Sequence, residues 1–251
     1  MIGKIRMPVL LMLVTALTLV PVAPAAAALI STEQEIQIGR DAAAQLQAEY
    51  GLVPDPGAYA YVASIGSRIA ATSSRPNLPW TFRVLNTSQV NAISLPGGFI
   101  YVTRGMTSFV QSEAELAFVL AHEIAHVDRR HHVSLIERHM GLSLLFSIIF
   151  GGRADTTAQI ANIVGGLLAR GFSREAEFQA DQVGVSLVHR AGFDAGAGLA
   201  FMERLRAAEG RDPSRFQVLF QTHPALGDRI TRVRDQLRTL GYRVGMSVAA
   251  A

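Results

Sequence analysis

The pattern of apolar and polar positions divides the chain into helical segments on either side of a short β-rich stretch. A first helix is expected to be capped by Ser31 or Thr32 and to run to about Tyr50. The prolines and glycine in 54–57 interrupt it, and a second helical stretch follows to about Thr72. Helical patterns return only after residue 105.

Between these helical parts, β-branched and aromatic residues accumulate. We predict strands at 81–85, 91–95 and 99–103, with the turn Pro96-Gly97-Gly98 between the last two. This order predicts a small antiparallel sheet. Because neither an internal repeat nor a low-complexity linker interrupts the pattern, we expect one mainly helical α+β domain over residues 29–251.

Residues 1–28 have the features of a cleaved signal peptide. Lys4 and Arg6 precede an apolar stretch at 8–20, and small residues occupy 25–28. The alternative is a membrane anchor, but prolines break the run before it reaches the ~20 apolar residues that span a bilayer. We therefore expect an exported, periplasmic protein.

Two further apolar segments lie at 141–150 and 160–168, and two interpretations remain open for them. Each is too short to span a membrane, so both could be buried core. Alternatively, they form an apolar hairpin that covers a cleft or makes peripheral contact with a membrane. The second interpretation would make the protein membrane-associated.

Composition narrows the function classes. The chain has 251 residues, of which 49% are hydrophobic and 17% charged, so it is not a disordered protein. Its formal net charge of +3 is too small to indicate a nucleic-acid partner. Since it has no cysteine, a disulfide framework, a thiolate metal site, a cysteine nucleophile and a cysteine-linked lipid anchor are all excluded.

Candidate chemistry begins in the helix after Ser112, where Ser112-Glu113-Ala114-Glu115 has the form of a capping box. His122 and His126 are four residues apart, so a helix places both imidazoles on one face. Glu123 lies beside them, where it can reach a metal-bound water without ligating the metal. This H-E-x-x-H pattern is typical of zinc hydrolases.

A catalytic zinc site needs a third protein ligand, and two candidates compete. His132 has the spacing of the extended H-E-x-x-H-x-x-G-x-x-H motif, but Arg129 occupies the position of its glycine. In a continuous helix His132 would lie about 15 Å along the axis from His122. We therefore interpret His131 and His132 as solvated residues at the helix end.

The second candidate lies in a helix that opens at Ser173. Glu177 and Asp181 share one face of it, and the small residues Ala180 and Gly184 would let it pack closely on the histidine helix. Glu177 could ligate the metal, and Asp181 could accept the free ring N–H of a ligand histidine. From the residues alone, a solvated acidic first turn is the favoured alternative.

Four segments of the chain resemble the HtpX, CAAX-prenyl-protease and OMA-type zinc metallopeptidases, most closely their exported BepA- and LoiP-like bacterial members. They are 32–39, 90–105, 116–126 and 173–181, and the tail at 222–230 is also similar. The resemblance implies a zincin-type fold and one zinc ion per chain. It implies the ligands His122, His126 and Glu177, with Glu123 as the catalytic glutamate and Asp181 supporting a ligand. The chain ends at Ala251 without the helical repeats of the BepA-like members, so recruitment of partners through such repeats is not expected.

Two functions follow as expectations. The first is a zinc endopeptidase that cleaves unfolded or misassembled envelope proteins, outer-membrane proteins among them, with Glu123 moving the proton. The second is a non-proteolytic holdase on the same fold. The strand residues Phe99, Ile100, Tyr101 and Val102 could bind substrate as an added edge strand. His223 could be an oxyanion donor or an occluding fourth ligand, oriented by Arg229.

Overall fold

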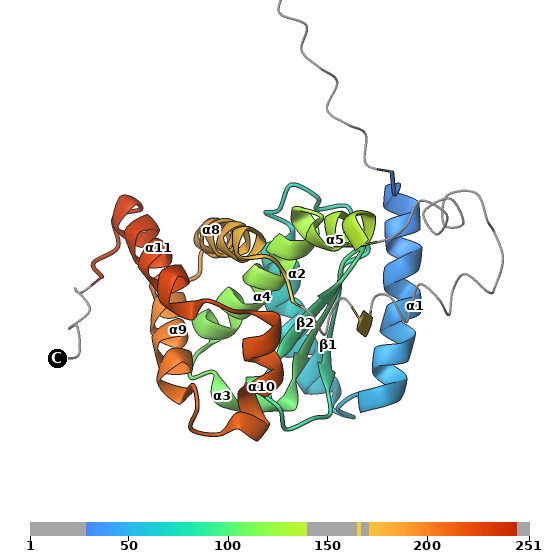
Figure 1. Cartoon of the computed structure of the whole chain (residues 1–251), viewed down its shortest axis with the longest axis horizontal. Helices are drawn as coiled ribbons and strands as arrows, with labels where there is room; N and C mark the ends of the chain where they lie inside the picture. Colours follow the sequence, from blue (N-terminus) through green and yellow to red (C-terminus); the bar gives the residue numbers. More distant parts are fainter. Residues whose placement is uncertain (1–28, 140–164, 167–170, 245–251) are drawn as a thin grey trace, which may run out of the picture.

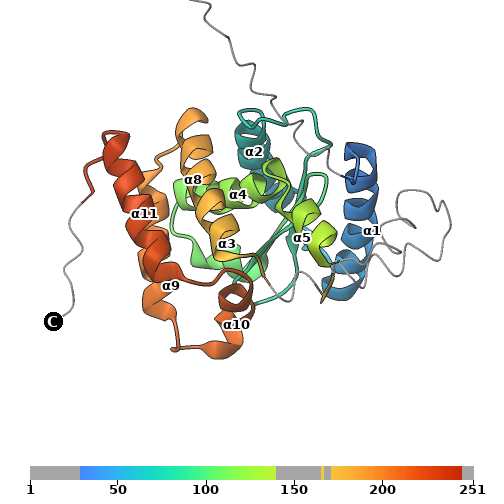
Figure 2. The same cartoon turned by 45° about the horizontal axis from the view of Figure 1, so that its top comes forward.

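The computed structural model describes residues 29–139, 165–166 and 171–244. The elements of these ranges are α1 (Thr32–Tyr50), α2 (Pro56–Ala70), β1 (Thr81–Leu85), β2 (Ala92–Leu95), β3 (Phe99–Thr103), α3 (Arg104–Phe109), α4 (Glu113–Asp128), α5 (His131–His139), α8 (Arg174–Arg190), α9 (Gly196–Ala208), α10 (Pro213–Thr222) and α11 (Leu226–Thr239). Figures 1 and 2 show α1 at one side, the sheet and α4 in the middle with α10 below α4, and α9 and α11 at the opposite side. The predicted α+β class is confirmed, and so are the predicted strands to within one residue.

Helix α1 begins where the sequence predicts. The Oγ of Ser31 accepts a hydrogen bond from the backbone N–H of Gln34, and the Gln34 side chain accepts one from the N–H of Ser31. The two residues therefore satisfy each other's backbone donors.

The sheet is mixed, so the expected antiparallel arrangement is wrong. Its order is β1-β3-β2; β2 and β3 form the expected antiparallel hairpin, but β1 pairs in parallel with the other side of β3. The chain crosses from β1 to the far edge before it forms the hairpin. A bridge between Leu52 and Leu85 pairs with the outer side of β1 only at its last residue. Among the described residues, no strand pairs with the outer side of β2, so this edge is open.

Two apolar cores lie on opposite faces of the sheet. Ile100 and Val102 of β3 belong to the core shared with α2, α4 and the C-terminal helices, whereas Tyr101 belongs to the core with α1 and α5. This alternation follows from the two-residue period of a strand. The sheet is thus held between α1 on one face and α2 with α4 on the other.

Helix α8 packs directly on α4 and brings two distant parts of the sequence together. At Gly184 a Cβ atom would lie 3.3 Å from the backbone nitrogen of His122, so a larger residue would push the helices apart. The close approach expected from the small residues of this helix is confirmed.

Some expectations fall outside the described residues: the signal peptide at 1–28 and the segments 141–150 and 160–168, apart from Gly165 and Gly166. In the described ranges, none of the helices has both the length and the apolar composition that a bilayer span requires.

Candidate metal centre

Helix α4 presents both histidines of the H-E-x-x-H pattern to one buried point. The Nε2 atoms of His122 and His126 lie 3.1 Å apart, and both residues are buried.

At the start of the helix only half of the expected capping box forms. Ser112 accepts from the N–H of Glu115 at 3.2 Å, but the Glu115 carboxylate accepts from the N–H of Gln111 instead.

Glu177 reaches the same point from α8. Its carboxylate oxygens lie 3.4 Å from Nε2 of His126 and 3.6 Å from Nε2 of His122, and its side chain is fully buried. Nδ1 of His223 lies 3.2 Å from the same carboxylate. His122, His126, Glu177 and His223 each direct one ligand atom into a space where all four atoms lie within 4.8 Å of one another.

Asp181 lies one turn beyond Glu177 and contacts the far side of the His122 ring. Its Oδ1 is 2.9 Å from Nδ1 of His122. Arg229 binds the Asp181 carboxylate through Nε at 2.7 Å and Nη2 at 2.8 Å, and its Nη1 lies 2.6 Å from Glu177. Arg229 contacts His223 only at the backbone carbonyl, at 3.4 Å, so it mainly holds the two carboxylates.

Glu123 lies beside the cluster and has a partner that sequence reasoning missed. Its Oε2 accepts a hydrogen bond of 2.6 Å from the hydroxyl of Ser94 on β2, and its Oε1 is 3.6 Å from Nε2 of His223. A hydroxyl buried in an otherwise apolar strand was the available signal, because such a group needs a partner. Ser94 is 1% exposed.

The interpretation of His131 and His132 as solvated is wrong, because both are buried. Helix α4 ends at Asp128, and Arg130 adopts a left-handed conformation with φ of 56° that turns the chain into α5. His131 then lies next to His126, and Nε2 of His132 donates to the carbonyl of Ser94 at 2.8 Å. His132 does not belong to the four-residue cluster.

Burial and the neighbouring charged groups together set the protonation state of each residue in the cluster. Burial lowers the pKa of His122, but the carboxylates of Asp181 and Glu177 outweigh burial and raise it to about 9. Burial holds the pKa of His126 well below its ordinary value, so that ring is neutral. Burial raises the pKa of Glu177, but His223 and Arg229 outweigh it and hold the carboxyl ionised. The site therefore offers a carboxylate and a neutral imidazole as donors.

A cleft of about 350 Å³ opens at Glu123. The residues that line it include Asn91, Ala92, Ile93, Ser94, Phe172, Thr222 and His223. Because β3 is the central strand, hydrogen-bonded to β1 and β2, the expectation that Phe99 to Val102 add substrate as an edge strand is wrong. The strand with an open edge at the cleft is β2.

Backbone pairing shows which groups of β2 face outward. The N–H of Thr103 donates to the carbonyl of Asn91, so the alternation of an antiparallel pair turns Ile93 toward β3 and turns Ala92 and Ser94 away from it. The bond from His132 to the Ser94 carbonyl agrees with this assignment. The outward N–H and C=O of Ala92 are thus placed at the cleft.

Comparisons with known proteins agree with this geometry. The chain is 30% identical over 223 residues to the beta-barrel assembly-enhancing protease of Yersinia pestis. The matched region covers 84% of this chain and 45% of that protein. It is 32% identical over 213 residues to the mitochondrial metalloendopeptidase OMA1 of Schizosaccharomyces pombe, with 83% of this chain and 62% of that protein covered. The chain thus spans less than two thirds of the length of these relatives.

The family match extends over most of the described structure. Residues 56–237 match peptidase family M48, and this range contains all four residues of the buried cluster together with Glu123, Asp181 and Arg229. The chain belongs to peptidase family M48.

Proposed function

We propose that the chain is a zinc-dependent endopeptidase that hydrolyses peptide bonds of unfolded or misassembled proteins of the cell envelope. The observation that carries the proposal is the buried cluster of His122, His126 and Glu177, with the carboxylate of Glu123 beside it. Membership of a peptidase family supports the same reaction.

The donor atoms fit zinc in chemistry and spacing. Zinc accepts nitrogen and carboxylate ligands at ~2.0–2.2 Å in tetrahedral geometry, which places neighbouring donor atoms roughly 3.3–3.5 Å apart. Among His122, His126 and Glu177, the donor atoms are separated by 3.1 to 3.6 Å when each histidine is paired with the nearer carboxylate oxygen of Glu177. His122, His126 and Glu177 would hold the ion, one per chain, and the bound ion would supply Lewis acidity toward the scissile carbonyl and a more acidic water.

The protein groups around that position have distinct roles. Glu123 is the general base that takes the proton of the attacking water and delivers it to the leaving amine, and Ser94 fixes its orientation. Asp181 orients His122, and Arg229 offsets the charge of both carboxylates.

His223 has two candidate roles, an occluding fourth ligand or an oxyanion donor. The position of its Nδ1 in the cluster, 3.4 Å from Nε2 of His122, favours the fourth-ligand role in this conformation. As a fourth ligand it would occupy the position that water or substrate needs, so its displacement would precede catalysis.

The open edge of β2 suits an extended polypeptide, because an added strand is bound through its backbone more than through its side chains. Unfolded or misassembled chains expose such segments. The Yersinia relative is named a beta-barrel assembly-enhancing protease, which supports a substrate among proteins of beta-barrel assembly. A signal peptide at 1–28 would place the enzyme in the periplasm, where 141–168 could contact a membrane.

Cleavage of unfolded casein tests the proposal. We expect the zinc-loaded protein to cleave casein, a chelator to stop cleavage and added zinc to restore it. Glu123→Gln should keep its zinc and lose roughly 10²–10⁴-fold in rate. The matched control is Glu113→Gln, an exposed residue of the same helix, which should cleave normally.

Two results would contradict the assignment. Cleavage by Glu123→Gln at the wild-type rate would exclude Glu123 as the base. If the wild type bound unfolded casein but did not cleave it with zinc present, the chain would be a holdase.

A further inference from the structure

The Nδ1 atoms of the two histidines of α4 face different kinds of side chain. Nδ1 of His122 faces the carboxylate of Asp181, whereas Nδ1 of His126 lies 3.0 Å from Nδ1 of His131. The other ring nitrogen of His131 lies 2.7 Å from Oε1 of Gln179 on α8. His126 is thus joined to Gln179 through a second imidazole.

We propose that Gln179 and His131 are positioning residues that fix the tautomer of His126 and so keep its Nε2 lone pair directed at the metal position. The inference rests on the proposed function, in which His126 is a metal ligand.

The order of the protons follows from what each group can donate. The amide oxygen of Gln179 accepts only, so Nε2 of His131 carries the proton and its Nδ1 is left as an acceptor. Nδ1 of His126 must then donate, which leaves Nε2 of His126 without a proton. This is the tautomer that a metal requires.

The opposite orientation of the Gln179 amide would reverse every bond. If its NH₂ group faced His131, His131 would accept at Nε2 and donate from Nδ1, and Nε2 of His126 would carry the proton. A protonated Nε2 cannot ligate a metal. Metal binding therefore selects the orientation in which the Gln179 oxygen faces His131.

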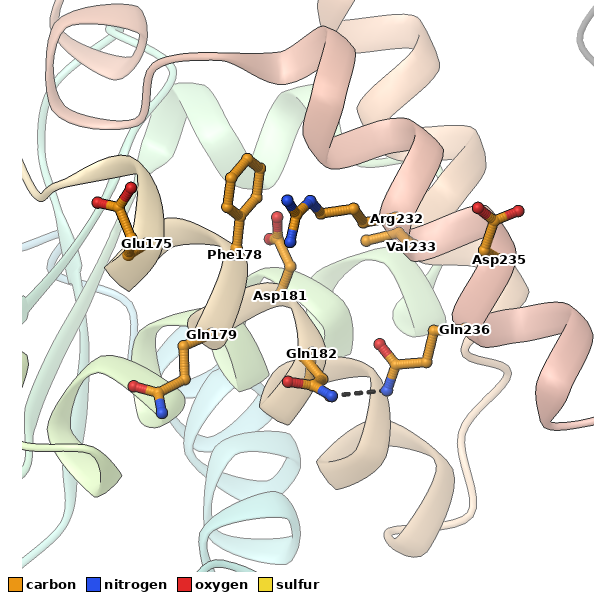
Figure 3. Close-up of a pocket in the computed structure, with 9 residues that line it drawn as sticks. All are labelled: Glu175, Phe178, Gln179, Asp181, Gln182, Arg232, Val233, Asp235 and Gln236. Carbon is orange, nitrogen blue, oxygen red and sulfur yellow. Dashed lines mark hydrogen bonds between the residues drawn. The ribbon is translucent and has the colours of Figure 1, made fainter.

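The fold places this chain of hydrogen bonds between α4, α5 and α8. The left-handed turn at Arg130 puts His131 beside His126. The ring of Phe172 stacks on His126 with centroids 4.0 Å apart and restricts its rotation. In Figure 3 the Gln179 side chain points away from the residues of α11 on the opposite wall of the pocket.

Because Gln179 is exposed, it can be changed without opening the core. Gln179→Met keeps the length of the side chain but replaces the amide oxygen with a sulfur that is only a weak acceptor. Gln179→Glu keeps an acceptor oxygen at the same position. Gln182→Met changes an exposed glutamine three residues further along α8 and is the matched control.

The readouts are the zinc dissociation constant, measured by competition with a chelator, and the ¹⁵N spectrum of the histidines in the zinc-loaded protein. We expect Gln179→Met to bind zinc about 10–100-fold more weakly than the wild type. Gln179→Glu and Gln182→Met should bind at least as tightly as the wild type. The spectrum should show His131 protonated at Nε2 and bare at Nδ1.

Zinc affinity of Gln179→Met within twofold of the wild type, or a proton on Nδ1 of His131, would overturn the inference. In either case the proposed function would stand if the protein still bound zinc and cleaved casein. A wild type that bound no zinc would contradict both.

Discussion

Arg229 reaches the candidate metal centre from α11, a helix that carries none of the clustered donors. It is 4% exposed and contacts both Glu177 and Asp181. Burial lowers the pKa of Arg229, but the two carboxylates outweigh burial, and the net effect is a pKa above the ordinary value of arginine. Without this cation the centre would hold two buried carboxylates beside Glu123, an arrangement that costs several kcal/mol.

Removing the charge of Asp181 tests its supporting role. Asp181→Asn keeps an acceptor near His122 but loses the carboxylate, so zinc affinity should fall by about 10–100-fold. Chelator competition measures this, and Glu175→Gln, an exposed residue of the same helix, is the control. Equal affinities of the two variants would show that Asp181 has only a packing role.

Zinc binding should also release a proton. The carboxylates outweigh burial and raise the pKa of His122 to about 9 in the metal-free protein, so His122 is protonated at pH 7 and must lose its proton to ligate. Calorimetry in buffers of different ionisation enthalpy should show about one proton released per zinc at pH 7. Apparent affinity should rise about tenfold per pH unit and level off above about pH 9. An affinity that does not change with pH would contradict this.

Spacing within one helix made part of the centre predictable. His122, Glu123 and His126 follow from the helical period, and the family resemblance favoured Glu177 as a ligand over a solvated turn. The partners Ser94 and Arg229 were not predictable in these roles, because their contacts depend on how distant segments pack. For the same reason the solvated interpretation of His131 and His132 failed.

At the level of elements, Glu35 joins α1 to two turns near the site. Its carboxylate accepts from Arg75 at 2.9 Å, from Arg130 at 3.0 Å and from the N–H of Gly97 at 3.3 Å, and it is 1% exposed. Arg130 forms the turn between α4 and α5, and Gly97 lies between β2 and β3. Glu35 therefore holds the open strand and the α4–α5 turn against α1.

Glu35→Ala should be strongly destabilising, because it removes a buried carboxylate that accepts hydrogen bonds from two partly buried arginines and from a backbone N–H. A cost of about 3–5 kcal/mol corresponds to a melting temperature lowered by roughly 10 °C. Glu33→Ala, at an exposed position of the same turn, should change stability by less than about 0.5 kcal/mol. Calorimetry that found the two variants equally stable would contradict this account of Glu35.

If substrate binds as a strand added to the open edge of β2, the backbone amides of the substrate contribute to its affinity. Only alternate backbone amides of an added strand can bond to the outward groups of Ala92. A peptide substrate N-methylated at one such amide should therefore show a KM raised about tenfold, which corresponds to one lost hydrogen bond, with kcat little changed. Methylation of the neighbouring amide, which faces away, is the control. If a scan of single methylations raised KM at no position, β2 would not be the binding edge.

The identity of this edge could not be predicted from the sequence. The accumulation of β-branched and aromatic residues located all three strands, and the Pro-Gly-Gly turn defined the hairpin. Neither signal tells whether β1 pairs with β2 or crosses to β3, because pairing order is decided by contacts between elements. Because the pairing order was predicted wrongly, the substrate strand was assigned to the central β3 and not to β2 at the edge.

Over the whole molecule, the centre lies where its N-terminal and C-terminal parts meet. The donor atoms come from α4, from α8 and from His223 at the end of α10, and 101 positions separate His122 from His223. A metal ion held by these groups would join α4, α8 and the end of α10.

Native mass spectrometry of the purified protein tests the central claim most directly, because it counts metal ions on each folded chain. We predict one zinc per chain in the wild type and in His132→Ala, and none in Glu177→Ala. A wild type without zinc, or zinc retained by Glu177→Ala but lost from His132→Ala, would contradict the assignment of His122, His126 and Glu177 as the zinc ligands.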